Sequence, residues 1–171
     1  MSSRTMHWQL GDRVPLAYLI TFACHGARLH GDERGAVTRR RNLFGTPLLE
    51  PNAALAARQR ESMRSRPYLL GERERRVVLA SIVEVCVFRQ WVLFAVHVRS
   101  NHVHAVIDAD DPGLANTLKA YASRALNDVE GPRRRWARGF SRRLLWSDEA
   151  VERAIHYVVH EQGAPMAVHH L

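Results

Sequence analysis

The fold is decided by residues 91–108, which read WVLFAVHVRSNHVHAVID. Only Ser100 and Asn101 separate its two apolar runs, and this pattern predicts a β-hairpin with a very short connection. Side chains alternate between the two faces of a strand, so His102 and His104 are expected to point the same way. The hairpin would therefore present two imidazoles side by side on one face of a sheet.

Working outward from the hairpin, hydrophobic periodicity and turn residues predict the remaining elements. These are, in chain order, a strand at 16–24, a helix at 72–88, the two hairpin strands at 91–99 and 102–108, a helix at 114–127, a strand at 143–146 and a helix that follows Ser147 and ends at Gly163. The order is βαββαβ followed by a helix. It predicts an α+β fold, a ferredoxin-like antiparallel four-stranded sheet with two helices on one face and the other face free for a ligand.

The chain of 171 residues is expected to form one domain over 1–171. Residues 28–71 lose periodicity and are rich in Arg and Pro, so they are interpreted as an insertion, with one helix near 53–64. The two cysteines, Cys24 and Cys86, lie in apolar surroundings and are expected to be buried free thiols. No stretch is apolar and long enough to cross a membrane, so no membrane partner and a cytoplasmic location are expected.

The net charge of +8 is carried almost entirely by arginine, since Lys119 is the only lysine. Arginine binds phosphate oxygens through two parallel hydrogen bonds and stacks on bases, so the surplus favours a nucleic-acid partner. A preference for arginine codons would explain arginine in place of lysine, but it would not explain the excess of basic over acidic residues.

Candidate chemistry lies on the hairpin and on the last helix. His102 and His104 can together bind one divalent cation if a third ligand comes from elsewhere, although a His-x-His step also fits a pair of surface histidines. On the last helix Tyr157 offers a nucleophile, and Glu161, one turn later on the same face, offers a ligand. A lone tyrosine equally fits half-buried packing.

These residues resemble the Y1 tyrosine transposases of the IS200 type and their relatives associated with repetitive extragenic palindromes, within the HUH single-strand nucleases. The family motif Pro-Asn-His-Val-His-Leu is matched by SNHVHA at 100–105, with Ser100 in place of proline. YVVHEQ at 157–162 resembles the family's tyrosine helix, and LWSDE at 145–149 resembles the segment before it. The segment LHGD at 29–32 and the arginine-rich insertion look like a bacterial subgroup, and the likeness covers residues 15–165.

The resemblance implies a metal-dependent transposase or endonuclease that cleaves and rejoins single-stranded, hairpin-containing DNA. His102 and His104 would hold Mg²⁺ or Mn²⁺, and Tyr157 would attack phosphorus to form a 5′-phosphotyrosine. Helix geometry favours Glu161 as the third ligand, whereas the family's usual residue type favours Gln162. Such proteins work either as homodimers or as monomers, and they would be nucleoid-associated when bound to DNA.

Further residues are expected to support this site. Asn101 would orient a metal ligand or the hairpin turn. Basic and aromatic side chains are candidates for phosphate contacts and base stacking. The candidate DNA-binding residues are Arg39, Arg40, Arg41, Arg133, Arg134, Arg135 and Trp136.

Three alternatives remain beside this interpretation. Tyr121, on the second helix, is a rival nucleophile. A histidine-triad nucleotide hydrolase would need a third histidine where this chain has Val106. A non-catalytic basic DNA-binding protein, such as a domesticated or degenerate transposase, would bind hairpin DNA without cleaving it.

Overall fold

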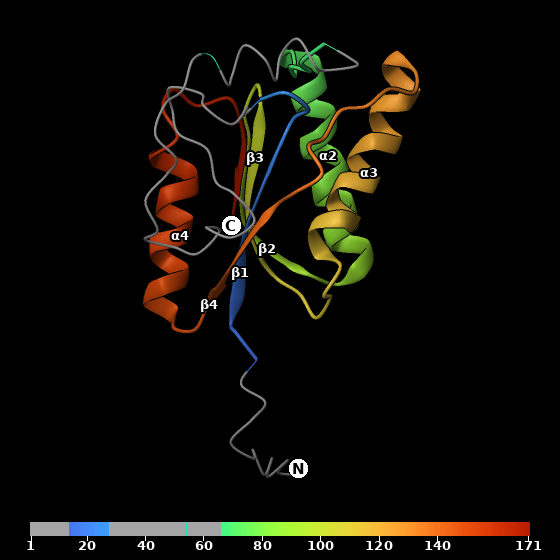
Figure 1. Cartoon of the computed structure of the whole chain (residues 1–171). Coiled ribbons are helices and arrows are strands. Elements are labelled where there is room, and N and C mark those ends of the chain that lie inside the picture. Colours follow the sequence, from blue (N-terminus) through green and yellow to red (C-terminus); the bar gives the residue numbers. More distant parts are fainter. Residues whose placement is uncertain (1–13, 28–53, 55–65) are drawn as a thin grey trace.

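The computed structural model describes residues 14–27, 54 and 66–171. Figure 1 shows a sheet with helices on both of its faces. The elements are β1 (Ala17–Ala23), α2 (Glu72–Arg89), β2 (Val92–Val98), β3 (His102–Asp108), α3 (Leu114–Glu130), β4 (Ser141–Leu145), α4 (Asp148–His160) and β5 (Ala167–His170). The α+β class and the predicted order of the first seven elements are therefore confirmed.

The sheet is fully antiparallel, with the strand order β4-β1-β3-β2-β5. The prediction of four strands is wrong, because β5 adds a fifth strand at the edge of β2. Its pairing joins Val98 to Ala167 and Ala95 to His170. The hairpin itself closes as expected, with the backbone N–H of Arg99 donating to the carbonyl of His102 at 2.8 Å.

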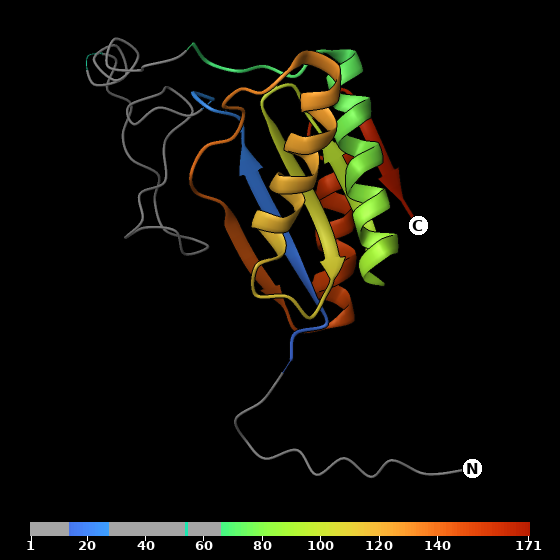
Figure 2. The ribbon, with the colours of Figure 1, turned by 90° about the vertical axis from the view of Figure 1, so that its right-hand side faces the viewer.

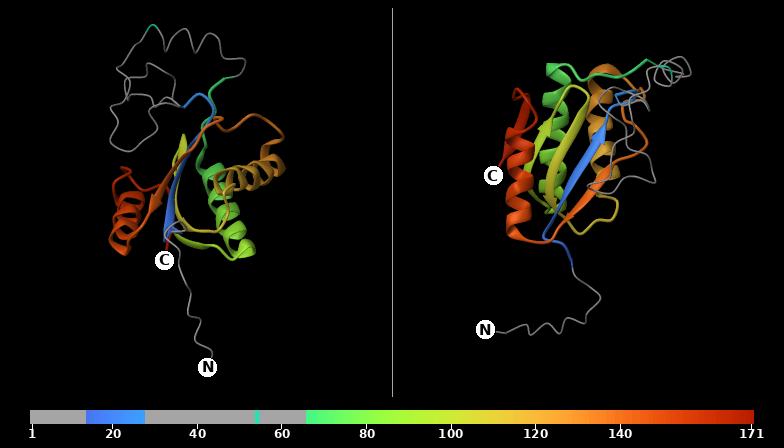
Figure 3. Two further views of the ribbon diagram at one scale, coloured as in Figure 1. Left: turned by 60° about the horizontal axis from the view of Figure 1, so that its bottom comes forward. Right: turned by 60° about the vertical axis from the view of Figure 1, so that its left-hand side comes forward.

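Helices α2 and α3 cover one face of the sheet and α4 covers the other (Figures 1 and 2), and each face has its own apolar core. On one face α2 and α3 pack against the side chains of β1 to β3 that include Phe22, Val103 and Ala105. On the other face α4 packs against a smaller cluster that includes Val106 and Leu145. The expectation of a free second face is therefore wrong for the part of that face that α4 covers, as the right-hand view of Figure 3 shows.

The last helix starts where predicted and ends earlier. Ser147 caps its first turn, with the hydroxyl accepting from the N–H of Ala150 at 3.2 Å, and two acidic residues follow the cap. The helix ends at His160 and not at Gly163, which has a φ of 78°. Glycine adopts this left-handed conformation readily, so the chain turns there toward β5.

Several predictions fall outside the described residues. Arg39, Arg40 and Arg41 do so, as does the helix near 53–64 apart from Ala54, which is helical.

Both cysteines are buried free thiols as predicted. Among the helices described here, none is long and apolar enough to span a bilayer.

Candidate active site

His102 and His104 project from β3 onto the face of the sheet that α4 covers. Val106, two residues further along the strand, packs in the α4-side core, so strand alternation places both histidines on that same face. Their ring centres lie 4.6 Å apart, and the ring planes meet at 80°. His104 is buried, whereas His102 is partly exposed. The predicted imidazole pair is therefore assembled.

Each imidazole is oriented by a neighbouring oxygen. Asn101 Oδ1 lies 2.6 Å from Nδ1 of His102, and Thr21 Oγ1 lies 2.7 Å from Nδ1 of His104. Histidines that ligate metals characteristically use their second ring nitrogen in this way, and the contact fixes the orientation of the ring. With Nδ1 hydrogen-bonded, Nε2 is the nitrogen that each ring would offer to an ion.

Tyr157 lies next to this pair on α4. Its ring centre is 5.5 Å from that of His104, and 38% of the residue is exposed. A partly exposed side chain with a hydroxyl group therefore lies beside His104, brought there by an element distant in sequence. A hydroxyl group beside an imidazole is a candidate nucleophile.

A third histidine, His97, connects α4 to the sheet. It pairs with His104 in the β2–β3 ladder and is fully buried. Its Nδ1 lies 3.0 Å from the carbonyl of Val158, and its Nε2 accepts from the N–H of Met166 at 3.2 Å. Burial lowers the pKa of His97, so the ring is held neutral. This contact fixes the helix backbone at the residue next to Tyr157.

Neither candidate for the third metal ligand, Glu161 or Gln162, has its side chain directed to the histidine pair. α4 ends at His160, and the Oε1 of Glu161 lies 2.9 Å from Nδ1 of His156. Gln162 donates from Nε2 to the carbonyl of Tyr157 at 3.1 Å. Within residues 14–27, 54 and 66–171, no three His, Cys, Asp or Glu side chains converge to hold a metal. The geometry thus gives no basis for preferring Glu161.

The histidine pair alone nevertheless fits a divalent cation. When two imidazoles bind one ion with N–metal distances of about 2.1 Å and an N–metal–N angle of about 90°, their ring centres lie about 4.6 Å apart. The separation between His102 and His104 equals this value. Imidazole is a good ligand for divalent transition metals including Mn²⁺, so the residue types fit the ion as well as the spacing does.

The four candidate DNA-binding residues of the loop between α3 and β4 differ in exposure. Arg133 and Arg134 are exposed, and the guanidinium of Arg133 lies over the ring of Tyr68. Trp136 is partly buried: its ring packs edge-on against Phe22, and its Nε1 donates to Ser123 at 3.0 Å. Trp136 therefore packs in the fold instead of standing out as a free stacking platform.

Arg135 is buried, unlike its two neighbours. Its guanidinium donates to Glu130 Oε1 at 2.9 Å, to Asn127 Oδ1 at 2.6 Å and to the carbonyl of Gly131 at 2.5 Å. Burial alone would raise the pKa of Glu130, but hydrogen bonds from Tyr68 and Arg135 hold that pKa below its usual value. In this position Arg135 holds the loop together and is turned away from solvent.

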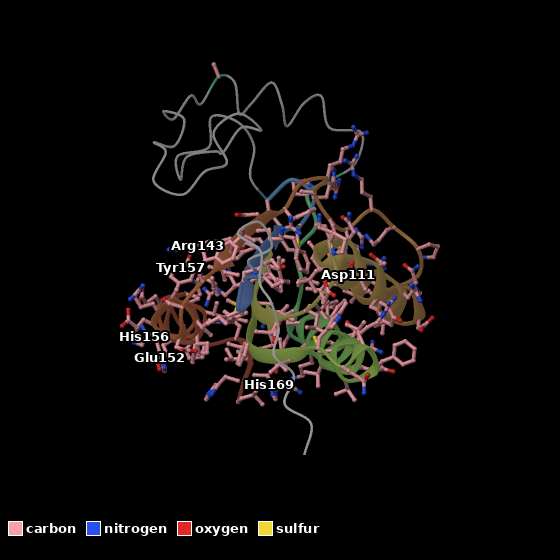
Figure 4. The ribbon with its side chains drawn as sticks, turned by 90° about the horizontal axis from the view of Figure 1, so that it is seen from below. Asp111, Arg143, Glu152, His156, Tyr157 and His169 are labelled. Carbon is pink, nitrogen blue, oxygen red and sulfur yellow. The ribbon has the colours of Figure 1, made fainter. Side chains whose placement is uncertain are left out.

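The sequence analysis treated Arg143 only as part of a strand and did not predict which face of the sheet it lies on. Arg143 lies two residues before the buried Leu145 on β4, so alternation places it on the α4 side of the sheet. Figure 4 shows Arg143 and Tyr157 on the same side of α4. Thr21 and His97 were also missed, and period-two alternation along β1, β2 and β4 is the signal that would have found all three.

The rival tyrosine, Tyr121, lies elsewhere. It is on α3, partly buried against the core of the opposite sheet face, and the guanidinium of Arg124 covers its ring at 4.6 Å. The sheet separates it from His102 and His104. Tyr157 is therefore the tyrosine that the fold brings to the histidine pair.

Together, the fold and the site define an α+β domain in which a His-x-His strand faces a tyrosine on the last helix. No family model matches the chain, and no curated protein does. Among solved structures, the chain is similar to one described as a REP-associated tyrosine transposase bound to a REP hairpin, with 11% identity and a TM-score of 0.47. The match covers 91% of this chain and 72% of that chain. A likeness of this degree assigns neither an activity nor a ligand.

Proposed function

We propose that the protein is a metal-dependent tyrosine transposase or endonuclease that cleaves and rejoins single-stranded, hairpin-containing DNA. The observation that carries the proposal is the approach of Tyr157 to His104, with ring centres 5.5 Å apart. Two histidines with oriented rings and an accessible tyrosine are the parts that such chemistry needs, and they come from β3 and α4 of one chain.

In the proposed reaction Tyr157 Oη attacks a backbone phosphorus of the DNA. A P–Oη bond forms and the P–O3′ bond breaks. The downstream fragment is then held through its 5′ phosphate as a phosphotyrosine, and the upstream fragment leaves with a 3′ hydroxyl after its oxygen takes up a proton. The phenol gives up its proton in the attack. The phosphotyrosine ester keeps the energy of the broken phosphodiester bond, so rejoining the DNA strand needs no nucleotide cofactor.

The chain's residues have distinct parts in this proposal. Asn101 and Thr21 hold the rings of His102 and His104, whose Nε2 atoms would bind Mg²⁺ or Mn²⁺. Such an ion supplies Lewis-acid polarisation of the phosphate and an aid to deprotonating a phenol whose ordinary pKa is about 10. Glu161 or Gln162 would complete the ligand set.

Positive charge near the site suits a DNA substrate. Arg143 is exposed on β4, and Arg133 and Arg134 are exposed on the loop that precedes that strand. Their guanidinium groups would contact phosphates and contribute affinity that falls as salt rises. The proposal includes a location in the cytoplasm, in association with the nucleoid, and leaves a homodimer as one form of the active protein.

The test is a denaturing gel of protein mixed with Mn²⁺ and single-stranded hairpin oligonucleotides labelled at either end. The oligonucleotides are drawn from DNA flanking the gene. A protein-linked 5′ product is expected, and it should be lost in Tyr157→Phe and in His102→Ala. Tyr121→Phe is the matched control and should keep the product. An adduct that survives in Tyr157→Phe would refute the assignment of the nucleophile.

A second candidate function, a non-catalytic basic DNA-binding protein, is favoured by the finding that the described part of the chain brings no third ligand to the histidine pair. Glu161 contacts His156 instead of the histidine pair. On this alternative, hairpin DNA binds in a salt-dependent way and no covalent product forms with any divalent ion. The variants Glu161→Ala and Gln162→Ala decide between the two candidates for the third ligand. Only replacement of the true ligand should reduce the amount of covalent product.

A further inference from the structure

A second pair of histidines lies on the outer side of α4, away from the sheet. His156 and His160 are one turn apart and both exposed, and their ring centres lie 5.0 Å apart. Figure 4 shows His156 beside Glu152 on the side of α4 that is turned away from the sheet, whereas Tyr157 lies on another side of the helix. The pair therefore faces solvent and is separate from the site described above.

From this arrangement we infer that His156 and His160 form a binding site for a divalent transition-metal ion of the Zn²⁺ type. Histidines at positions i and i+4 of a helix project in the same direction, and this spacing is used for zinc in metalloenzymes. Two imidazoles bound to one zinc ion at the tetrahedral angle hold their ring centres about 5.2 Å apart. The observed separation is within a few tenths of an ångström of that distance.

Glu161 supplies the independent support for this site. Its carboxylate accepts from Nδ1 of His156 at 2.9 Å, which fixes the tautomer with the proton on Nδ1 and leaves Nε2 as the ligand nitrogen. A carboxylate that holds a histidine in this way is the usual outer partner of a zinc-binding imidazole. Glu161 is thus assigned to orient His156, and water would fill the remaining positions around the ion.

The electrostatic setting also favours a cation. His156 and His160 belong to the last turn and a half of α4, where the carbonyl ends of the helix carry partial negative charge. Glu161 adds a full negative charge at the same end. The inference does not depend on the proposed DNA chemistry, because its two ligands, His156 and His160, have no part in that chemistry; only Glu161, a candidate third ligand there, is shared.

The test measures Zn²⁺ binding by the full-length protein in competition with a chromogenic chelator. All variants carry His102→Ala and His104→Ala, so that zinc at the other histidine pair does not contribute. One zinc ion should still bind in this background, and its Kd should rise at least tenfold in His156→Ala and in His160→Ala. Glu161→Ala should raise the Kd by ~10–100-fold, as expected for the loss of an outer partner.

The matched control is the double variant His169→Ala/His170→Ala, which removes two other histidines from β5 and should leave the Kd unchanged. Because His156 and His160 are exposed, their variants should keep the thermal stability of the parent in the presence of EDTA. Absence of zinc binding in the parent background, or a Kd unaffected by both His156→Ala and His160→Ala, would overturn the inference. The DNA-cleavage assay is a separate readout, so failure of one proposal is distinguishable from failure of the other.

Discussion

Replacing Arg135 by methionine should destabilise the protein by about 3 kcal/mol. Only 1% of the Arg135 side chain is exposed, and it donates to Glu130, Asn127 and Gly131. Removing one partner of a buried ion pair costs ~3–5 kcal/mol, because the remaining charge and carbonyls lose their partners. The lower end of that range applies here, since the Glu130 side chain is 22% exposed and water can solvate it.

Urea denaturation measures this loss as a lower midpoint with an unchanged slope, and calorimetry should show a melting temperature lower by ~6–12 °C. The matched control is Arg134→Met, one residue earlier and exposed, for which a change within ~0.5 kcal/mol is expected. In DNA binding the order should reverse, with Arg134→Met the weaker binder when both proteins are folded. A loss of less than 1 kcal/mol in Arg135→Met would refute the structural role assigned to this side chain.

Three other predictions concern buried groups. Because burial lowers the pKa of His97, the unfolded chain binds a proton near pH 6.5 that the folded chain does not. The free energy of unfolding should therefore fall on acidification, by at most ~1.4 kcal/mol per pH unit. Denaturation at pH 7.5 and 5.5 measures this dependence, and His97→Gln should flatten it. Lys119→Met should cost about 2 kcal/mol, since the Nζ of Lys119 donates to the carbonyls of Ala137 and Gly139; a melting temperature equal to the parent's would contradict this. Burial raises the pKa of both Cys24 and Cys86 to about 12, so neither thiol should react with Ellman's reagent at pH 8 until the protein is unfolded, and rapid labelling of the native protein would show that this is wrong.

The histidine pair could be predicted because its geometry follows from local rules alone. A strand turns alternate side chains to one face, so the placement of His102 and His104 needed only the identification of β3 as a strand. The two-residue connection at Ser100-Asn101 likewise needed no distant contact. Local periodicity thus determined both the hairpin and the shared direction of the two rings.

Helix periodicity alone could not decide the third ligand, because the direction of the Glu161 side chain depends on its contacts at the end of α4. The backbone N–H of Glu161 still donates to the carbonyl of Tyr157 at 3.2 Å, but the Glu161 carboxylate lies 2.9 Å from Nδ1 of His156. β5 was missed for a related reason: AVHH is short and half polar, and it is a strand because the edge of β2 offers backbone partners. Neither outcome could be read from residues close in sequence.

Arg135 illustrates a different limit of the sequence. Its neighbours Arg133 and Arg134 have the same side chain, and nothing local distinguishes the one that turns inward. The difference comes from Glu130 and Asn127 at the end of α3, which together with the carbonyl of Gly131 surround the buried guanidinium. Only the packing of the loop against that helix end selects Arg135.

The placement of Tyr157 against its own sheet has a consequence for kinetics. Because His104 and Tyr157 belong to one chain, the proposed reacting groups meet without a second molecule. Under the proposed function, the strand-cleavage rate per molecule at saturating DNA should not change when the protein is diluted a hundredfold. A rate that falls on dilution would indicate that the helix with the tyrosine is exchanged between chains.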